Sequence, residues 1–440
     1  MTAALLLSAV LTCGVVAGDQ TRQRPPRPQP PPPPPAPTRD WIDVGGDVGL
    51  MALYMPRLEV IQLRPRVRGD VTLDPTTWLR LHADALVEGQ LDDRQDFKVF
   101  EDYSARVREA WVQLAGNRAD LRAGRGRLVW GRLDEVQPTD VINPIDIAGF
   151  LLDGRSEARR AVNFIRGRVY PVNGLSIEGV FVPHFEHGVF DELDEERSPF
   201  NLNNDLVLPA NVSLSTTTIE EREPDVDWGS PLGGARVSVT LGRVDVSGSV
   251  YEGADGFGAV TFEPEIVVGP TVVGRLVETF SRFRMYGADF ESVAGAWAFR
   301  GEMAYFAEKK LAGVSVPGLV DGRVLEAGAG FDRRVGGLRI YGLGLYHREW
   351  SDEDPGVEKS NLNLVGSVEQ SFARDTHLLR AFGVVNPEDR STFVRGVWLW
   401  SAADNVTLEV SGGAFLGTSN DNLGRFEGRD FAFARFRYRF

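Results

Sequence analysis

Arginines and carboxylates follow one another at close spacing in residues 120–160. Arginine and carboxylate side chains form bidentate ion pairs, and charges gathered at a constriction decide which ions pass it. We therefore expect a charged constriction, to which the last strand of the chain contributes. The same pairs would also serve to hold a loop to a wall, and that structural interpretation stays open. The expected members are Arg122, Arg125, Arg127, Arg132, Asp134, Asp140, Asn143, Asp146, Arg155, Arg159, Arg160, Arg435 and Arg437.

The sequence offers little support for catalysis. His184 and His187 have a spacing suited to a metal, but the acidic stretch DELDEERSPF that follows is equally typical of a solvated loop. The sequence contains no HExxH motif, no GxSxG motif and no phosphate-binding glycine loop. A hydrolase would need a nucleophile, a base and a group that orients the base, and nothing singles out such a set. We expect a protein that is not an enzyme, with no cofactor and no resident metal.

The elements that carry these charges have a period of two. In FAFARFRYRF, residues 431–440, one parity holds Ala432, Ala434, Phe436, Tyr438 and Phe440, and the other turns cationic at Arg435. Successive side chains of a strand point to opposite faces. The stretch therefore predicts a strand with one apolar, aromatic face and one charged face. The stretch 78–91 alternates in the same way.

Short and long connections alternate along the chain, as they do in outer-membrane barrels. We predict a transmembrane antiparallel up-and-down β-barrel of about eighteen strands, with sixteen as the alternative. An even number places both ends of the barrel on one side, with the short turns. The predicted segments are 41–51, 57–73, 78–91, 104–115, 119–131, 161–170, 175–184, 234–241, 244–253, 281–293, 296–307, 323–334, 338–350, 360–373, 376–386, 391–402, 406–417 and 431–440.

Composition agrees with such a barrel and excludes other classes. Mean hydropathy is −0.18, and no apolar run after the N-terminal segment has the length of ~18 residues or more that a helical span needs. A barrel escapes this test because only alternate residues meet lipid. The net charge of −14 argues against nucleic acid as a partner.

The N-terminal forty residues are predicted to lie outside the barrel. Residues 1–18 have the apolar core and small residues of a signal peptide, and residues 19–40 are a proline-rich periplasmic linker. Lipoprotein processing at Cys13, the single cysteine, is the rival interpretation. The predicted barrel is residues 41–440, with an inward-folding loop at 132–160.

One stretch of the sequence resembles the motif of a known protein family. DLRAGRGRLVWGRLDEVQPTDVINPIDIAG, residues 120–149, follows REAWVQL at 108–114. It resembles a group of Gram-negative outer-membrane barrels known as a domain of unknown function, with a "LRxGR…VVWG…PTDVINPxD" pattern. The chain departs from that pattern at Gly126, Arg127 and Ile145. A shorter likeness links it to alginate-export-type barrels. The resemblance implies a porin-like barrel.

We expect an outer-membrane channel or exporter with an arginine-lined, loop-constricted lumen. The alternatives are the outer-membrane component of a lipid or polysaccharide export system and an anchor or adhesin without transport. The expected partners are outer-membrane lipid, the barrel-assembly machinery and, for an exporter, a periplasmic or inner-membrane component. Phe436, Tyr438 and Phe440 look like the signal that this machinery reads. Both termini are expected in the periplasm.

Overall fold

A computed structural model of the chain describes residues 41–92, 103–134, 136–189, 211–216, 219–418 and 423–440. The predicted signal peptide and proline-rich linker lie outside the described residues, so both stay predictions.

Eighteen antiparallel strands close into a barrel, which confirms the larger of the two predicted counts. β23 pairs with β1, from Asp47 opposite Arg439 to Tyr54 opposite Ala432, and this pairing closes the wall. The short β4 (Leu91–Asp92) adds to the edge of β2. The wall strands are β1 (Ile42–Met55), β2 (Val60–Leu73), β3 (Leu79–Gly89), β5 (Tyr103–Ala115), β6 (Ala119–Gly126), β7 (Val162–Val169), β8 (Leu175–Val182), β11 (Leu232–Leu241), β12 (Val244–Ala254), β15 (Arg282–Ala294), β16 (Trp297–Ala312), β17 (Leu319–Val335), β18 (Leu338–Trp350), β19 (Lys359–Phe372), β20 (His377–Val385), β21 (Thr392–Ala403), β22 (Val406–Leu416) and β23 (Phe431–Arg439).

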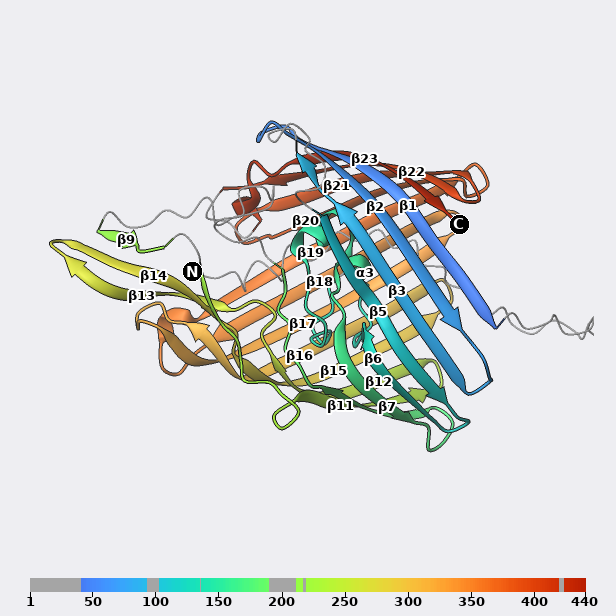
Figure 1. Ribbon diagram of the computed structural model, residues 1–440, viewed down its shortest axis with the longest axis horizontal. Helices are drawn as coiled ribbons and strands as arrows, with labels where there is room; N and C mark the ends of the chain where they lie inside the picture. Colours follow the sequence, from blue (N-terminus) through green and yellow to red (C-terminus); the bar gives the residue numbers. More distant parts are fainter. Residues whose placement is uncertain (1–40, 93–102, 135, 190–210, 217–218, 419–422) are drawn as a thin grey trace, which may run out of the picture.

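The connections are sorted by length between the two ends of the barrel, as the sequence predicts. The opposite end carries the longer connections, although 56–59 and 386–391 there are short. Figure 1 shows the short turns at the end where β23 finishes. These turns are 74–78, 116–118, 170–174, 242–243, 295–296, 336–337, 373–376 and 404–405.

The two faces of β23 differ as the alternation predicts. Phe436 and Tyr438 are exposed on the outer face, whereas Phe433 and Arg435 are buried inside the barrel. Exposed valines, leucines and aromatic residues cover the outer face of the other strands too, for example Val250, Phe290 and Leu364. An apolar exterior that closes on itself leaves no backbone edge for lipid to meet. The chain is therefore a transmembrane β-barrel.

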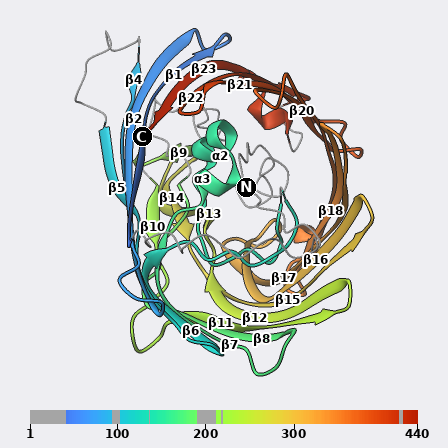
Figure 2. The ribbon, with the colours of Figure 1, turned by 90° about the vertical axis from the view of Figure 1, so that its right-hand side faces the viewer.

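The helices in the described residues are short. α2 (Ile147–Asp153) and α3 (Arg155–Ala158) lie within the ring of strands, as Figure 2 shows. Two 3₁₀ turns, η3 (Pro355–Val357) and η4 (Gly424–Phe426), sit in connections at the long-loop end. Among the described residues, no helix combines the length and the apolar character that crossing a bilayer requires.

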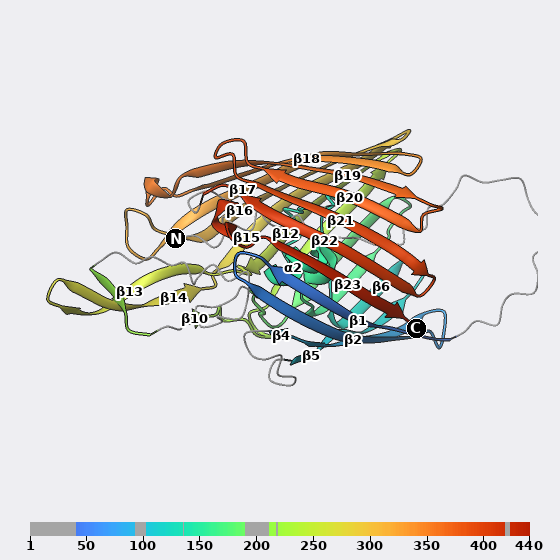
Figure 3. The same ribbon diagram turned by 90° about the horizontal axis from the view of Figure 1, so that it is seen from above.

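A second, small sheet stands beyond the long-loop end of the barrel. β13 (Ala259–Val268) and β14 (Thr271–Thr279) form a hairpin, to which β9 (Val212–Leu214) and β10 (Glu220–Arg222) add in parallel with β14. Figures 1 and 3 show this hairpin projecting from the barrel. The predicted long connections therefore contain strand structure of their own.

Asp354 ties two of the long-end connections together. Its buried carboxylate accepts the backbone N–H groups of Val314 at 2.7 Å, Ser315 at 2.7 Å and Val316 at 3.0 Å, and that of Gly356 at 2.9 Å. Burial opposes ionisation, but the four donors prevail and hold the pKa of Asp354 at about 2.

This low pKa predicts how the Asp354 contacts respond to acid. Because the pKa is lower in the folded than in the unfolded chain (about 3.9), the stabilisation is complete above pH ~4 and is lost towards pH ~2. We expect the difference in thermal unfolding midpoint between wild type and Asp354→Asn to be constant from neutral pH to about pH 5 and to shrink below about pH 4. Measurement by heat-modifiable electrophoretic mobility checks this. A difference unchanged at pH ~2 would contradict the assignment.

Candidate functional site

The connection between β6 and β7, residues 127–161, folds into the lumen; we call it the constriction loop. β6 ends at Gly126, five residues before the predicted end at 131, because the chain turns inward there. Asn143 closes the base of the loop: its Oδ1 accepts the N–H of Leu128 at 2.8 Å, and its Nδ2 donates to the carbonyl of Arg160 at 2.7 Å. Asp146 caps α2 by accepting the N–H of Gly149 at 2.8 Å.

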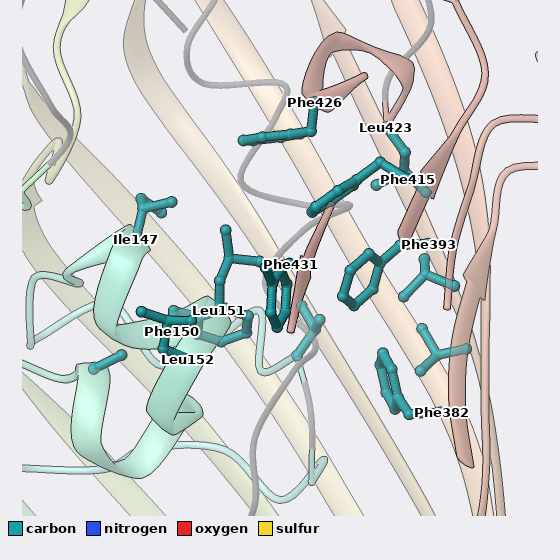
Figure 4. Close-up of a cluster of buried hydrophobic side chains, with 14 of the residues drawn as sticks. Ile147, Phe150, Leu151, Leu152, Phe382, Phe393, Phe415, Leu423, Phe426 and Phe431 are labelled. Carbon is teal, nitrogen blue, oxygen red and sulfur yellow. The ribbon is translucent and has the colours of Figure 1, made fainter. Parts of the chain in front are cut away.

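The apolar side of α2 packs on the inner wall of the barrel. Phe150, Leu151 and Leu152 are fully buried in a cluster with side chains of β1 and of β18 to β23. Figure 4 shows this face of α2 opposite Phe393 and Phe431. Buried aliphatic and aromatic side chains each contribute about 1.5–3 kcal/mol relative to exposure. The helix is therefore held by hydrophobic contact as well as by charge.

Two arginines of the wall hold the C-terminal end of α2. Arg395 donates to the carbonyl of Leu151 at 2.9 Å, and Arg435 donates to the carbonyl of Leu152 at 3.2 Å. Arg435 also pairs with Asp153 at 2.5 Å. Cations stabilise the unsatisfied carbonyls at a helix end. Arg435 was predicted from the sequence, whereas Arg395 was not.

On the β5 side, Glu109 gathers two of the predicted arginines. Arg127 donates to it at 2.8 and 3.0 Å and also reaches the carbonyl of Ser156 in α3 at 2.7 Å. Arg122 donates to Glu109 at 3.1 Å and lies 3.6 Å from the centre of the Trp111 ring. Arg127 therefore links the wall to the loop, and Arg122 belongs to the wall.

A β-bulge lets a neighbouring arginine join this group. The register between β3 and β5 shifts at Asp84, so that Arg108 is an extra residue on β5. Its guanidinium lies 3.6 Å from Asp84 and donates to Glu157 of α3 at 2.7 Å. Bulges redirect side chains in this way. Strict alternation in the sequence could not have placed both Arg108 and Glu109 against the loop.

The far side of the loop binds β12, β15, β16 and β18. Arg132 pairs with Asp289 at 2.5 Å and reaches Ser247 at 3.2 Å. Asp134 accepts from Arg300 at 3.0 Å and from Arg339 at 2.6 Å. The loop is thus bound to opposite parts of the wall, on strands far apart in the sequence.

Glu302 of β16 holds the turn of the loop most closely. Its buried carboxylate accepts the N–H of Arg132, the N–H of Leu133 at 2.6 Å and the hydroxyl of Thr139 at 3.1 Å. Gly131, which has φ +103°, approaches so closely that a Cβ there would stand 2.8 Å from the carboxylate oxygens. Glu302 was not predicted from the sequence, although its inward parity in RGEMAYF is a signal that points to it.

The other predicted residues are placed as follows. Arg159 donates to Asp140 at 2.7 Å within the loop, and Arg160 donates to the carbonyl of His187 at 3.0 Å. Arg437 lies 3.7 Å from Asp47 in the wall. Arg155 begins α3, and its side chain lies outside the described part.

Arg125 lies apart from the inner group. It has the opposite parity to Arg122 on β6 and forms a bidentate pair with Glu186 of the β8–β11 connection. The described arginines of the predicted set are therefore bound to carboxylates or backbone carbonyls, and apolar clusters share the lumen with them.

One group of side chains in the described residues has ligand atoms close enough for a metal. His187, Glu221 and Glu223 place one ligand atom each within 4.8 Å of one another. The Nδ1–H of His187 donates to the carbonyl of Gly188 at 2.7 Å, and its Nε2 lies 3.8 Å from Glu221. His184 is not a member and instead meets the edge of Trp228. Both glutamates are exposed, as in a solvated acidic surface.

A family profile described as "Protein of unknown function (DUF1302)" matches residues 81–326, more than half of the chain and all of the constriction loop. No curated protein matches the chain.

Solved structures with a similar fold are outer-membrane proteins. Pseudomonas aeruginosa OccK5 (OpdH) matches with 9% identity and a TM-score of 0.49, over 91% of this chain and 96% of that one. P. aeruginosa OpdK with vanillate matches with 10% identity and a TM-score of 0.49, over 90% of this chain and 98% of that one. Salmonella typhi OmpF in complex with daunomycin matches with 10% identity and a TM-score of 0.45, over 91% of this chain and 97% of that one. Likeness at this level assigns no solute and no residue role here.

Proposed function

The chain belongs to the DUF1302 family, and from this premise we propose that it is an outer-membrane channel whose constriction loop selects the solute and controls its passage. One observation carries the proposal: a loop inside a closed barrel is bound to opposite sides of the wall, by Arg435 on one side and by Glu302 on the other. Such a loop narrows the lumen. Its polar attachments are small sets of contacts that can be released, and the apolar packing of α2 adds to them.

Single-channel recording of the refolded chain in a planar bilayer tests the proposal. We expect stable conductance steps interrupted by closures, since the loop occupies the lumen. The reversal potential under a salt gradient reports ion preference. Because the loop arginines are paired with carboxylates, we expect weak preference between anions and cations. Folded barrel that never conducts under any voltage would refute the channel.

We further propose that the short turns and the last strand face the periplasm and that the long connections face outward. The sorting of connections by length supports this orientation. An epitope inserted at Gly269 in the β13–β14 hairpin should be accessible to antibody on intact cells, and one inserted at Gly336 in a short turn should not. The opposite labelling would reverse the orientation.

The aromatic residues of β23 predict how the barrel is assembled. Phe440 exchanges backbone hydrogen bonds of 3.1 Å with Gly46 across the closing seam, and its ring is exposed on the outer face with Phe436. We expect Phe440→Ala to lower the amount of folded barrel in membranes several-fold, because the assembly machinery would read these rings. Phe299→Ala, also exposed but on β16, is the control. Equal loss in both variants would contradict a specific role for β23.

A further inference from the structure

A cavity of about 160 Å³ lies between the constriction loop and the long-loop half of the barrel wall. The loop supplies residues 136–145, and the wall supplies the ends of β7, β8, β11, β12, β15 and β16. The cavity therefore lies at the long-loop side of the constriction, where a solute that enters from that side would arrive first.

The walls of this cavity are mainly apolar. Val182, Leu232, Tyr251, Phe283 and Phe306 face it from five strands, and all five are buried. A cavity of about 150 Å³ lined by apolar side chains holds a molecule the size of benzene. The present cavity therefore has room for one ring-sized apolar body.

The charged side chains that line the cavity are already paired. Lys309 pairs with Asp255 at 2.6 Å, and its ammonium lies 5.0 Å from the centre of the Phe306 ring. The carboxylates of Asp140, Glu186 and Glu326 also line the cavity, and they pair with Arg159, Arg125 and His347. Burial raises the pKa of Asp255, although Lys309 opposes this effect. A third ion would lose its hydration here without gaining a free partner, whereas a hydroxyl could hydrogen-bond to the existing pair.

We propose that this cavity binds a small, uncharged, mainly apolar solute with one hydrogen-bonding group. Solutes of this class would then be the substrates of the channel. The proposal rests on the proposed channel function. Since the loop forms one wall, an occupant touches the segment that Glu302 holds and lies directly before the constriction.

The test uses 4-fluorobenzyl alcohol as the probe, observed by ¹⁹F nuclear magnetic resonance, with the refolded full chain in nanodiscs. We expect saturable line broadening above that of empty nanodiscs. Unlabelled benzyl alcohol should reverse it, and glycerol should not. Ala254→Leu fills the cavity and should weaken binding by roughly tenfold or more, because the added methylene groups occupy the volume of the ring. Val182→Phe fills the cavity from another strand and should weaken binding in the same way. It replaces Ala254→Leu if that variant does not fold. Ala432→Leu, on the outer face of β23, is the matched control and should bind as wild type does.

Broadening that does not saturate, or that is equal in Ala254→Leu, Val182→Phe and Ala432→Leu, would overturn the inference. A barrel that conducts but binds no probe would refute the cavity as a solute site and leave the channel intact. A barrel that binds the probe but never conducts would refute the channel.

Discussion

Replacing Arg395 and Arg435 together with methionine is expected to release α2 from the wall and to increase the single-channel conductance. The two guanidiniums hold the carbonyls of Leu151 and Leu152, and Arg435 pairs with Asp153. Removing one partner of a buried ion pair costs about 3–5 kcal/mol, because the other charge is left buried. On this side of the lumen α2 would then be held mainly by its apolar contacts, while the contacts of the loop with Glu302 and Arg300 remain. Conductance in planar bilayers, recorded with the same salt on both sides, measures the effect.

Arg334→Met is the matched control for this double variant. Arg334 faces the lumen on β17 and lies 3.6 Å from Glu369, and its ion pair involves no residue of the loop. The control should conduct as wild type does. Heat-modifiable electrophoretic mobility shows whether the double variant folds. If it folds and still has wild-type conductance and closures, Arg395 and Arg435 do not hold the loop in the lumen.

Glu302→Ala is expected to detach the turn of the loop from β16. The substitution leaves the N–H groups of Arg132 and Leu133 and the hydroxyl of Thr139 without their acceptor. Each buried donor left unsatisfied costs about 1–3 kcal/mol. We therefore expect trypsin to cleave after Arg132 in the variant but not in wild type, and the open state to be populated longer in bilayer recordings.

Two further variants separate loop release from simple loss of charge. Gly131→Ala leaves Glu302 in place but would put a Cβ 2.8 Å from its carboxylate, so it should produce the same cleavage. Glu308→Ala removes an exposed glutamate of the same strand, which lies 3.6 Å from Arg284, and should change neither readout. Protection at Arg132 in both Glu302→Ala and Gly131→Ala would show that the turn is held by other contacts.

The conductance and the probe-binding experiments answer two separate questions about the solute. Conductance tests whether a path exists, whereas probe binding tests what the cavity at Tyr251 and Phe283 accepts. Because the cavity shares the 136–145 segment with the constriction, we expect variants that release the turn, such as Glu302→Ala, also to weaken probe binding. This coupling would join the two observations in one mechanism.

Local patterns in the sequence were enough to predict the barrel and to favour eighteen strands over sixteen. The alternation in residues 431–440 depends only on neighbouring residues, because a strand turns successive side chains to opposite faces. Phe436 and Tyr438 therefore lie outside and Arg435 inside, as predicted. Turn residues such as those at 242–243 are equally local, and they separated the strands correctly.

The wall residues that bind the loop could not be predicted from local patterns in the sequence. Glu302 is 170 residues from Arg132, and Arg395 is 244 residues from Leu151, so no local pattern relates them. Their meeting depends on barrel closure, which sets the relative height of distant strands, and on the bulge that turns Arg108 inward. Arg125 was expected in the inner group, although its parity on β6 is opposite to that of Arg122, and it pairs with Glu186 of the β8–β11 connection.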